Sequence, residues 1–215
     1  MKTLLYKEFR LASHPTTFLF PLLSAMLLIP NYPYYVVFFY TTLGIFFVCL
    51  SGRENHDIFY TMLLPVEKRS LVRARMLFAV CMEAVQLVLA VPFAVLRTHF
   101  AMPGNAAGMD ANTAFFGLAL GMLGVFNLVF FTRYYAAPEQ VGKAFAIGSI
   151  AEFVYMAAAE SCTFVVPFVH SVLDTPDPQH LPAKLIVLAL GAAAFALLTL
   201  LACARAEKTF ARLDL

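Results

Sequence analysis

Residues 53–75 read RENHDIFYTMLLPVEKRSLVRAR. This stretch, called the charged island below, holds five of the fifteen lysine and arginine residues of the chain, together with Glu54, Asp57 and Glu67. Such a dense group of charges does not lie in hydrocarbon, where each lysine or arginine near the centre costs about 2.5 to 3.5 kcal/mol. The island therefore faces water, and it separates the apolar runs before it from those after it.

The composition is that of an integral membrane protein. Of the 215 residues, 61% are hydrophobic and only 13% are charged, whereas charged residues make up about a quarter of a soluble domain. The mean hydropathy is +0.79. A formal net charge of +2, scattered over short polar segments, gives no support for nucleic-acid binding. The cysteines and histidines have unrelated spacings, so we expect neither a disulfide framework nor a metal site.

The apolar runs predict an all-α fold with six membrane-spanning helices, since a span needs about 20 mainly apolar residues. The expected spans are residues 13–29, 34–50, 76–96, 111–131, 144–169 and 183–204. The first two share the turn Pro30-Asn31-Tyr32-Pro33, which predicts a tight hairpin. No linker is long enough to divide the chain, so we expect one membrane domain, residues 1–215.

The orientation follows from the lysine and arginine bias of the short loops. With the N-terminus inside, thirteen of the fifteen basic residues lie on the cytoplasmic side, and only Arg97 and Lys184 lie at the outer ends of spans. The expected outer loops carry Asp110, Asp174 and Asp177 instead. We therefore expect a multi-pass protein of the plasma membrane with both termini in the cytoplasm.

The segment ahead of the first span predicts an interfacial helix along the inner leaflet. One side of its helical projection is apolar and consists of Leu4, Leu5, Phe9, Leu11 and Ala12. Glu8 falls within this apolar arc. Its carboxylate needs a cationic or backbone partner there.

Three carboxylates lie inside the expected spans, Glu83 in the third and Glu152 and Glu160 in the fifth. At about 1.5 Å per residue, Glu83 and Glu152 fall at nearly the same depth, in the cytoplasmic third, and Glu160 lies nearer the outside. One interpretation is that they line a substrate path or form a proton relay. The other is that they hold helices together through partners such as Gln86 or Asn127.

The outer end of the fifth span is interrupted by proline. Pro167 breaks the apolar sequence after Glu160, and residues 174–182 form an acidic, proline-rich turn. A proline ends or kinks a helix, and non-helical backbone at membrane depth has to be covered by protein or line a cavity. A pair of short outer helices between spans five and six and an ordinary kinked helix both fit this pattern.

Within the charged island, residues 57–64 predict a short amphipathic helix that Pro65 ends. In the segment that follows, Leu71 and Val72 lie opposite Arg73, as in a helix that starts in water and continues into the third span. The island therefore predicts a compact cytoplasmic knob suited to a soluble partner. The sequence contains no nucleotide-binding P-loop and no G-x-S-x-G motif.

Two motifs carry a resemblance to a known family. They are Leu4-Leu5-Tyr6-Lys7-Glu8-Phe9-Arg10 near the N-terminus and Leu64-Pro65-Val66-Glu67-Lys68-Arg69-Ser70-Leu71-Val72-Arg73-Ala74-Arg75 in the island. Together with the six-span layout and the cytoplasmic termini, they make the chain resemble the membrane permease of type 2 ATP-binding-cassette (ABC) transporters, in the compact branch common in Gram-positive bacteria.

The resemblance implies a half-transporter with no catalytic residues and no cofactor of its own. It would pair with a second permease subunit, an identical copy or a close paralogue, and with two cytoplasmic ATPases that bind ATP and Mg²⁺. It would export an amphipathic peptide, a lipid-like molecule or an antibiotic.

The resemblance also implies roles for particular residues. The loop 52–75 would carry a coupling helix, residues 57–64, with residues 132–143 as a second ATPase contact. The ATPase-coupling residues would be Asp57, Tyr60, Leu63, Leu64, Pro65, Lys7 and Glu8. Together with Glu83, which lies at the depth of Glu152, the candidate substrate-path residues are Thr41, Thr42, Glu83, Glu152 and Glu160.

Two other classes of function remain open. A proton-coupled secondary carrier would use Glu83, Glu152 and Glu160 as a relay, although the inverted repeats typical of carriers are not evident. An intramembrane enzyme, or a membrane assembly or immunity factor, would involve no transport. The missing catalytic constellation argues against the enzyme.

Overall fold

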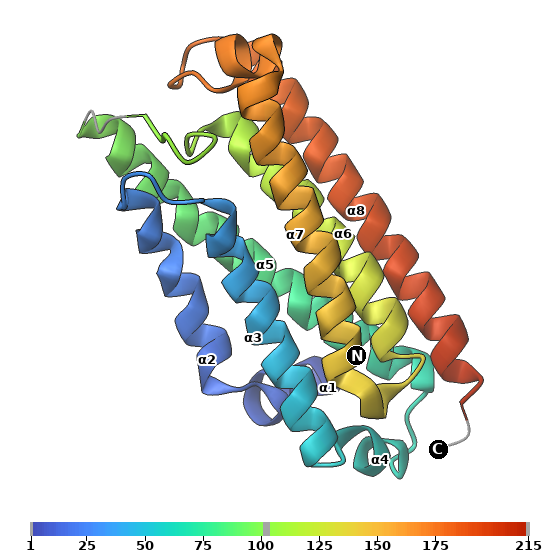
Figure 1. Cartoon of the computed structure of the whole chain (residues 1–215). Helices are drawn as coiled ribbons and strands as arrows, with labels where there is room; N and C mark the ends of the chain where they lie inside the picture. The colour runs from blue at the N-terminus through green and yellow to red at the C-terminus, as the bar shows by residue number, and fades with distance from the viewer. Residues whose placement is uncertain (1, 101–103, 214–215) are drawn as a thin grey trace.

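The computed structural model describes residues 2–100 and 104–213, and all regular structure within these ranges is helical. The elements are α1 (Lys2–Lys7), the π-helical turn η1 (Glu8–Ala12), α2 (Pro15–Leu19), the 3₁₀ helix η2 (Phe20–Leu28), α3 (Tyr35–Glu54), α4 (Asp57–Met62), α5 (Lys68–His99), α6 (Thr113–Tyr134), η3 (Pro138–Gln140), α7 (Val141–Val165), η4 (Val169–Leu173) and α8 (Leu181–Ala211). The long helices form one bundle (Figure 1). The expected all-α fold is confirmed.

Five helices are long and apolar enough to cross a membrane: α3, α5, α6, α8 and the segment Pro138–Val165. A bent pair, in which Lys2–Ala12 and Pro15–Leu28 meet at 98°, brings the number to as many as six if the pair is one span, and its second arm covers the first expected span. That arm is short, but nine of its residues are 3₁₀ helix, which rises about 2.0 Å per residue instead of 1.5 Å. It therefore reaches about 26 Å, close to the roughly 30 Å of a hydrocarbon core.

The two ends of the bundle differ. α4 and the two ends of the chain lie at one end, called the knob end below (Figure 1). The loops 104–112 and 174–180 lie at the other end, called the loop end. The charged island is thus folded at the knob end, in the loop between the second and third spans, as expected.

Several helices extend beyond the apolar runs from which they were predicted. α5 begins at Lys68 rather than at residue 76, and α8 continues to Ala211 rather than ending at 204. Once a helix has formed, each further residue adds a hydrogen bond at little cost, so it continues into water until a residue breaks it. The helical turns at the knob end that lie outside the apolar runs are therefore continuous with the spanning helices.

The segment between α7 and α8 contains less helix than expected. α7 ends at Val165 because Val166, which precedes Pro167, has extended backbone, the conformation that a following proline favours. After this one-residue break, residues 167–173 are helical again and lead through η4 into the loop at 174–180. In place of the expected pair of outer helices there is thus one short helix, separated from α7 by the break at Val166.

The N-terminal helix packs on protein with most of its apolar side. Leu4 and Ala12 are buried, and Phe9 makes an edge-to-face contact with Phe78 of α5 at 4.8 Å between ring centroids. Only Leu11, which is 78% exposed, points away from the bundle. The helix therefore lies across the first span as part of the folded core at the knob end.

The backbones of α6 and α8 touch through glycines. A Cβ placed on Gly191 would come within 1.9 Å of the carbonyl oxygen of Gly117, and one on Gly124 within 2.9 Å of the Cα of Phe195. Small residues allow this close approach, which supplies the packing energy that joins helices in a membrane. On its other side, α6 packs against α7 through Phe126 and Gly148.

We expect Gly191→Ala to separate α6 from α8 and to lower the free energy of unfolding by about 1 to 3 kcal/mol, because the added methyl group overlaps a backbone atom that cannot move aside. Gly142→Ala is the matched control, since a Cβ there meets nothing within 4 Å. Thermal unfolding of the two variants in the same detergent measures the difference. Equal melting temperatures would contradict the close α6–α8 contact.

Candidate functional site

Four charged side chains meet at the knob end, and we call them the four-charge cluster: Lys7, Glu8, Asp57 and Arg75. The Arg75 guanidinium donates through Nε to Glu8 Oε2 and through Nη2 to Asp57 Oδ2, the latter at 2.6 Å. Lys7 Nζ lies 2.7 Å from Asp57 Oδ1 and 3.4 Å from Glu8 Oε1. Arg75 is 2% exposed and Glu8 is fully buried. The cationic partner that Glu8 required is thus Arg75.

Two positive and two negative groups balance one another in the cluster. Burial alone would raise the pKa of Asp57, but the charge of Arg75 and the hydrogen bond and charge of Lys7 outweigh it, so that pKa lies below its usual value. Removing one partner from such a group leaves an unpaired buried charge, which costs far more than removing both. The loss of a single member is therefore the change that destabilises the cluster most.

The cluster joins three segments that are distant in sequence. Glu8 lies in η1, Asp57 begins α4 and Arg75 lies in the second turn of α5. Lys7 Nζ also donates to Thr61 Oγ1 at 3.0 Å, which adds a second tie to α4. α4 is consequently fixed to the base of α5 and to the N-terminal helix.

The side of α4 that faces away from the cluster is apolar and exposed. Phe59, Tyr60, Leu63 and Leu64 are each between 53% and 67% exposed. We call these four residues the docking face. A group of large apolar side chains on a surface that faces water marks an interaction site.

A cleft of about 430 Å³ adjoins the docking face. Ile58 and Phe59 line one side, and residues 136–140, in the loop between α6 and α7, line the other. Two segments that the resemblance named as ATPase contacts, 57–64 and 132–143, thus meet across one cleft.

The structure divides the seven predicted ATPase-coupling residues into two groups. Tyr60, Leu63, Leu64 and Pro65 lie on the surface. Glu8 is fully buried, and the side chains of Lys7 and Asp57 are only 16% and 18% exposed. The carboxylate of Glu8 is paired with Arg75 inside the chain, so its predicted part in coupling would be indirect. Lys7 and Asp57 hold α4 in place from inside.

A network of polar side chains crosses the interior of the bundle. Asn127 Nδ2 donates to Glu83 Oε2 at 3.1 Å and to Thr199 Oγ1 at 3.2 Å. Thr42 Oγ1 lies 3.0 Å from Glu152 Oε2. On the first span, Ser24 accepts a hydrogen bond of 3.0 Å from Gln86. Each of the six spans thus contributes at least one member to this network, which we call the interior network.

The interior network is incompletely satisfied. Within the described part of the chain, Glu83 Oε1, Glu152 Oε1 and Thr41 Oγ1 are buried without a hydrogen-bond partner. The Thr42 hydroxyl has one hydrogen but lies near two acceptors, the Phe39 carbonyl oxygen at 2.8 Å and the Glu152 carboxyl group. If that hydrogen goes to Phe39, the Glu152 carboxyl group has to carry a proton and donate it.

The five predicted substrate-path residues do not line one open path within a single chain. Thr41, Thr42, Glu83 and Glu152 are at most 2% exposed. Glu83 and Glu152 have separate hydrogen-bond partners, Asn127 and Thr42. Glu160 lies apart, near the loop end, where it accepts a hydrogen bond of 2.9 Å from the backbone N–H of Met109. The role of these residues in a substrate path between two subunits therefore stays a prediction.

Sequence reasoning missed the role of Arg75, although a signal was present. Arg75 lies four residues after Leu71 and three after Val72, so all three fall on one face of a helix. Leu71 and Val72 are buried, and Arg75 is buried with them. Its position within a basic segment hid this, because basic segments are usually solvated.

We expect Arg75→Met to cost about 3 to 5 kcal/mol of stability, because it leaves Glu8 charged and buried without its main partner. The double variant Glu8→Met/Arg75→Met should be closer to the natural chain, since it removes both charges and keeps the pair Lys7–Asp57. Thermal unfolding in detergent measures both. A double variant that is less stable than the single one would contradict the pairing.

These features establish a multi-span helical membrane protein with exposed apolar side chains at one end and an enclosed polar interior. No protein-family model, curated protein or solved structure matches the chain. The groups that bear on function are the docking face with its cleft, the four-charge cluster and the interior network.

Proposed function

We propose that this chain is the membrane-spanning permease subunit of an ATP-driven ABC exporter, and that a cytoplasmic ATPase binds its docking face. The observation that supports this most is the docking face itself, because four large apolar side chains are exposed on α4 and on the two residues that follow it, Leu63 and Leu64. Within one chain such exposure has no stabilising role. The two motifs of the sequence, 4–10 and 64–75, are the motifs on which the resemblance to type 2 permeases rests.

The four-charge cluster provides the mechanical link that coupling requires. A partner that moves α4 also moves Arg75, because two carboxylates hold the guanidinium. α5 has 32 residues and is about 48 Å long, so it carries a displacement through the whole bundle. Glu83 and Gln86 lie on this helix. ATP-driven closure of the partner would thus repack the interior network by rigid-body movement.

The complete transporter in this proposal contains two permease subunits and two ATPases that bind ATP and Mg²⁺. The knob end is cytoplasmic, in agreement with the lysine and arginine bias. Because Thr42, Glu83 and Glu152 are enclosed in one chain, a path for an amphipathic cargo would form between the two subunits and reach these residues only when the helices separate.

We expect an ABC ATPase gene next to the gene of this chain, and the test is co-expression of the two proteins. We expect the two to copurify, and the double variant Tyr60→Ser/Leu63→Ser to reduce ATPase recovery about tenfold or more, as loss of apolar anchors at an interface does. Both side chains are more than 60% exposed, so the fold is retained. Phe100→Ser, an equally exposed aromatic residue at the loop end, is the control.

Undiminished ATPase recovery with the double variant would overturn the docking assignment. The absence of any neighbouring ABC ATPase gene, together with transport that needs no ATP, would overturn the class of transporter.

A proton-coupled carrier is the second candidate, and the interior network favours it. Glu83 and Glu152 are enclosed, and each leaves one oxygen without a partner in the described part of the chain. Ionisable groups placed in this way form proton relays in other membrane proteins.

A proton-flux measurement separates the two candidates. Because the exporter takes its energy from ATP, we expect proteoliposomes of the chain alone to hold an imposed pH gradient as well as empty liposomes do. Glu152→Gln, which can still accept the hydrogen bond from Thr42, should change nothing. If the natural chain dissipates the pH gradient and Glu152→Gln abolishes this loss, the result would favour the carrier and count against the exporter.

A further inference from the structure

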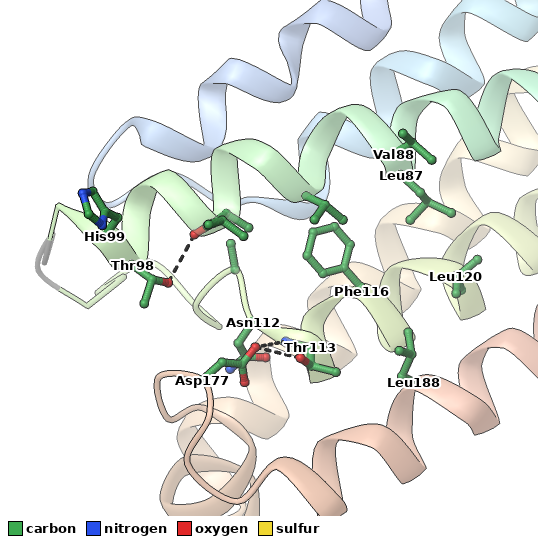
Figure 2. Close-up of a pocket in the computed structure, with 14 residues that line it drawn as sticks. Leu87, Val88, Thr98, His99, Asn112, Thr113, Phe116, Leu120, Asp177 and Leu188 are labelled. Carbon is green, nitrogen blue, oxygen red and sulfur yellow. Dashed lines mark hydrogen bonds between the residues drawn. The ribbon is translucent and has the colours of Figure 1, made fainter.

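We infer that the groove between α5 and the pair α6/α8 binds one acyl chain of a membrane lipid, in the leaflet at the loop end. The groove has a volume of about 650 Å³, within the range of about 300 to 1,000 Å³ that is usual for ligand sites. Its wall on α5 extends from Leu87 to His99, and the opposite wall includes Phe116, Leu120 and Leu188 (Figure 2). This inference does not depend on the proposed function.

The groove arises because the loop-end half of α5 diverges from α6 and α8 (Figure 1). Pro92 lies in this half of α5, where the proline ring removes a backbone hydrogen bond and favours a bend. Near the knob end the same helix packs closely, with Phe78 fully buried. The space between the helices therefore widens toward the loop end.

The position of the groove identifies its surroundings as hydrocarbon. Val88 and Val95, which line it on α5, are 70% and 61% exposed, so it opens sideways out of the bundle at the depth of the spans. Spaces of this kind are filled, because the side chains that line an empty void lose dispersion contacts. Water is not favoured against these side chains, so the occupant is a hydrocarbon chain.

The length and polarity of the groove match one leaflet. From Leu87 to His99 the α5 wall rises about 18 Å, whereas one leaflet contributes about half of a hydrocarbon core of roughly 30 Å. Polar side chains gather only at the loop end of the groove, where Figure 2 shows Thr98, His99, Asn112, Thr113 and Asp177. A lipid with its tail between the helices would thus place its polar head among these residues.

The charges around the head position are already paired. Asp177 accepts hydrogen bonds from Lys184 Nζ at 2.9 Å and from the backbone N–H and hydroxyl of Thr113 at 2.9 and 2.7 Å. Arg97 is bound to Asp110 at 3.2 Å in the adjoining cavity. With both cations neutralised, the site should select the acyl chain rather than the charge of the headgroup.

Photocrosslinking of the purified chain in nanodiscs tests this inference. The probe is phosphatidylcholine with a diazirine on one acyl chain, and mass spectrometry locates the adducts. We expect adducts concentrated on residues 87–99 and 113–120, and the same yield with the phosphatidylglycerol probe.

Two variants fill the groove, Val91→Trp and Leu188→Trp, and each should lower the adduct yield there about tenfold. Leu190→Trp is the control, because Leu190 lies close to Leu188 along α8 but is 65% exposed and outside the groove. Size exclusion and thermal unfolding verify that the variants are folded.

Adducts spread evenly over all exposed helix faces would overturn the inference, as would equal yields in the filled and control variants. A disulfide between two Val91→Cys chains in nanodiscs would show that a second copy covers the groove, and would also overturn it. A several-fold preference for one headgroup would contradict selection by the acyl chain.

Discussion

A guanidinium that leaves water needs carboxylates around it, and Arg75 obtains them from two segments that are distant in sequence. Glu8 and Asp57, which repel each other, lie close together because they share the cationic partners Arg75 and Lys7. Because the group is buried, removal of any one member leaves another charge without its partner. The N-terminal helix, α4 and the base of α5 consequently behave as one body, and the docking face has a fixed position relative to the bundle.

α5 connects every feature that bears on function. Its first turns carry Arg75, its middle carries Glu83 and Gln86, and its last turns form one wall of the lipid groove. A rigid helix of this length transmits a displacement at the knob end to both other regions. The bound acyl chain that we infer would move with it, so lipid binding and the rearrangement of the interior network share one mechanical element.

Much of the fold was predictable from apolar periodicity, and so was part of the site. The exposed side of α4 and the burial of Leu71 and Val72 followed from helical spacing, and the need of Glu8 for a partner followed from its place in an apolar arc. The helical period also placed Arg75 on the buried face, but basic composition concealed it. The enclosure of Thr42 and Glu152 was not predictable, because it depends on how α3 and α7 pack.

The sequence by itself determined that this chain crosses a membrane several times and that residues 53–75 fold in water, because hydrocarbon excludes dense charge whatever the fold. The sequence also accounts for the break after Val165, since Pro167 acts on its own neighbour, Val166. Only the tertiary structure decided that Glu8 meets Arg75, that Gly117 meets Gly191 and that α5 diverges to leave a groove. These features depend on how separate helices pack, and the local sequence does not specify the distances between them.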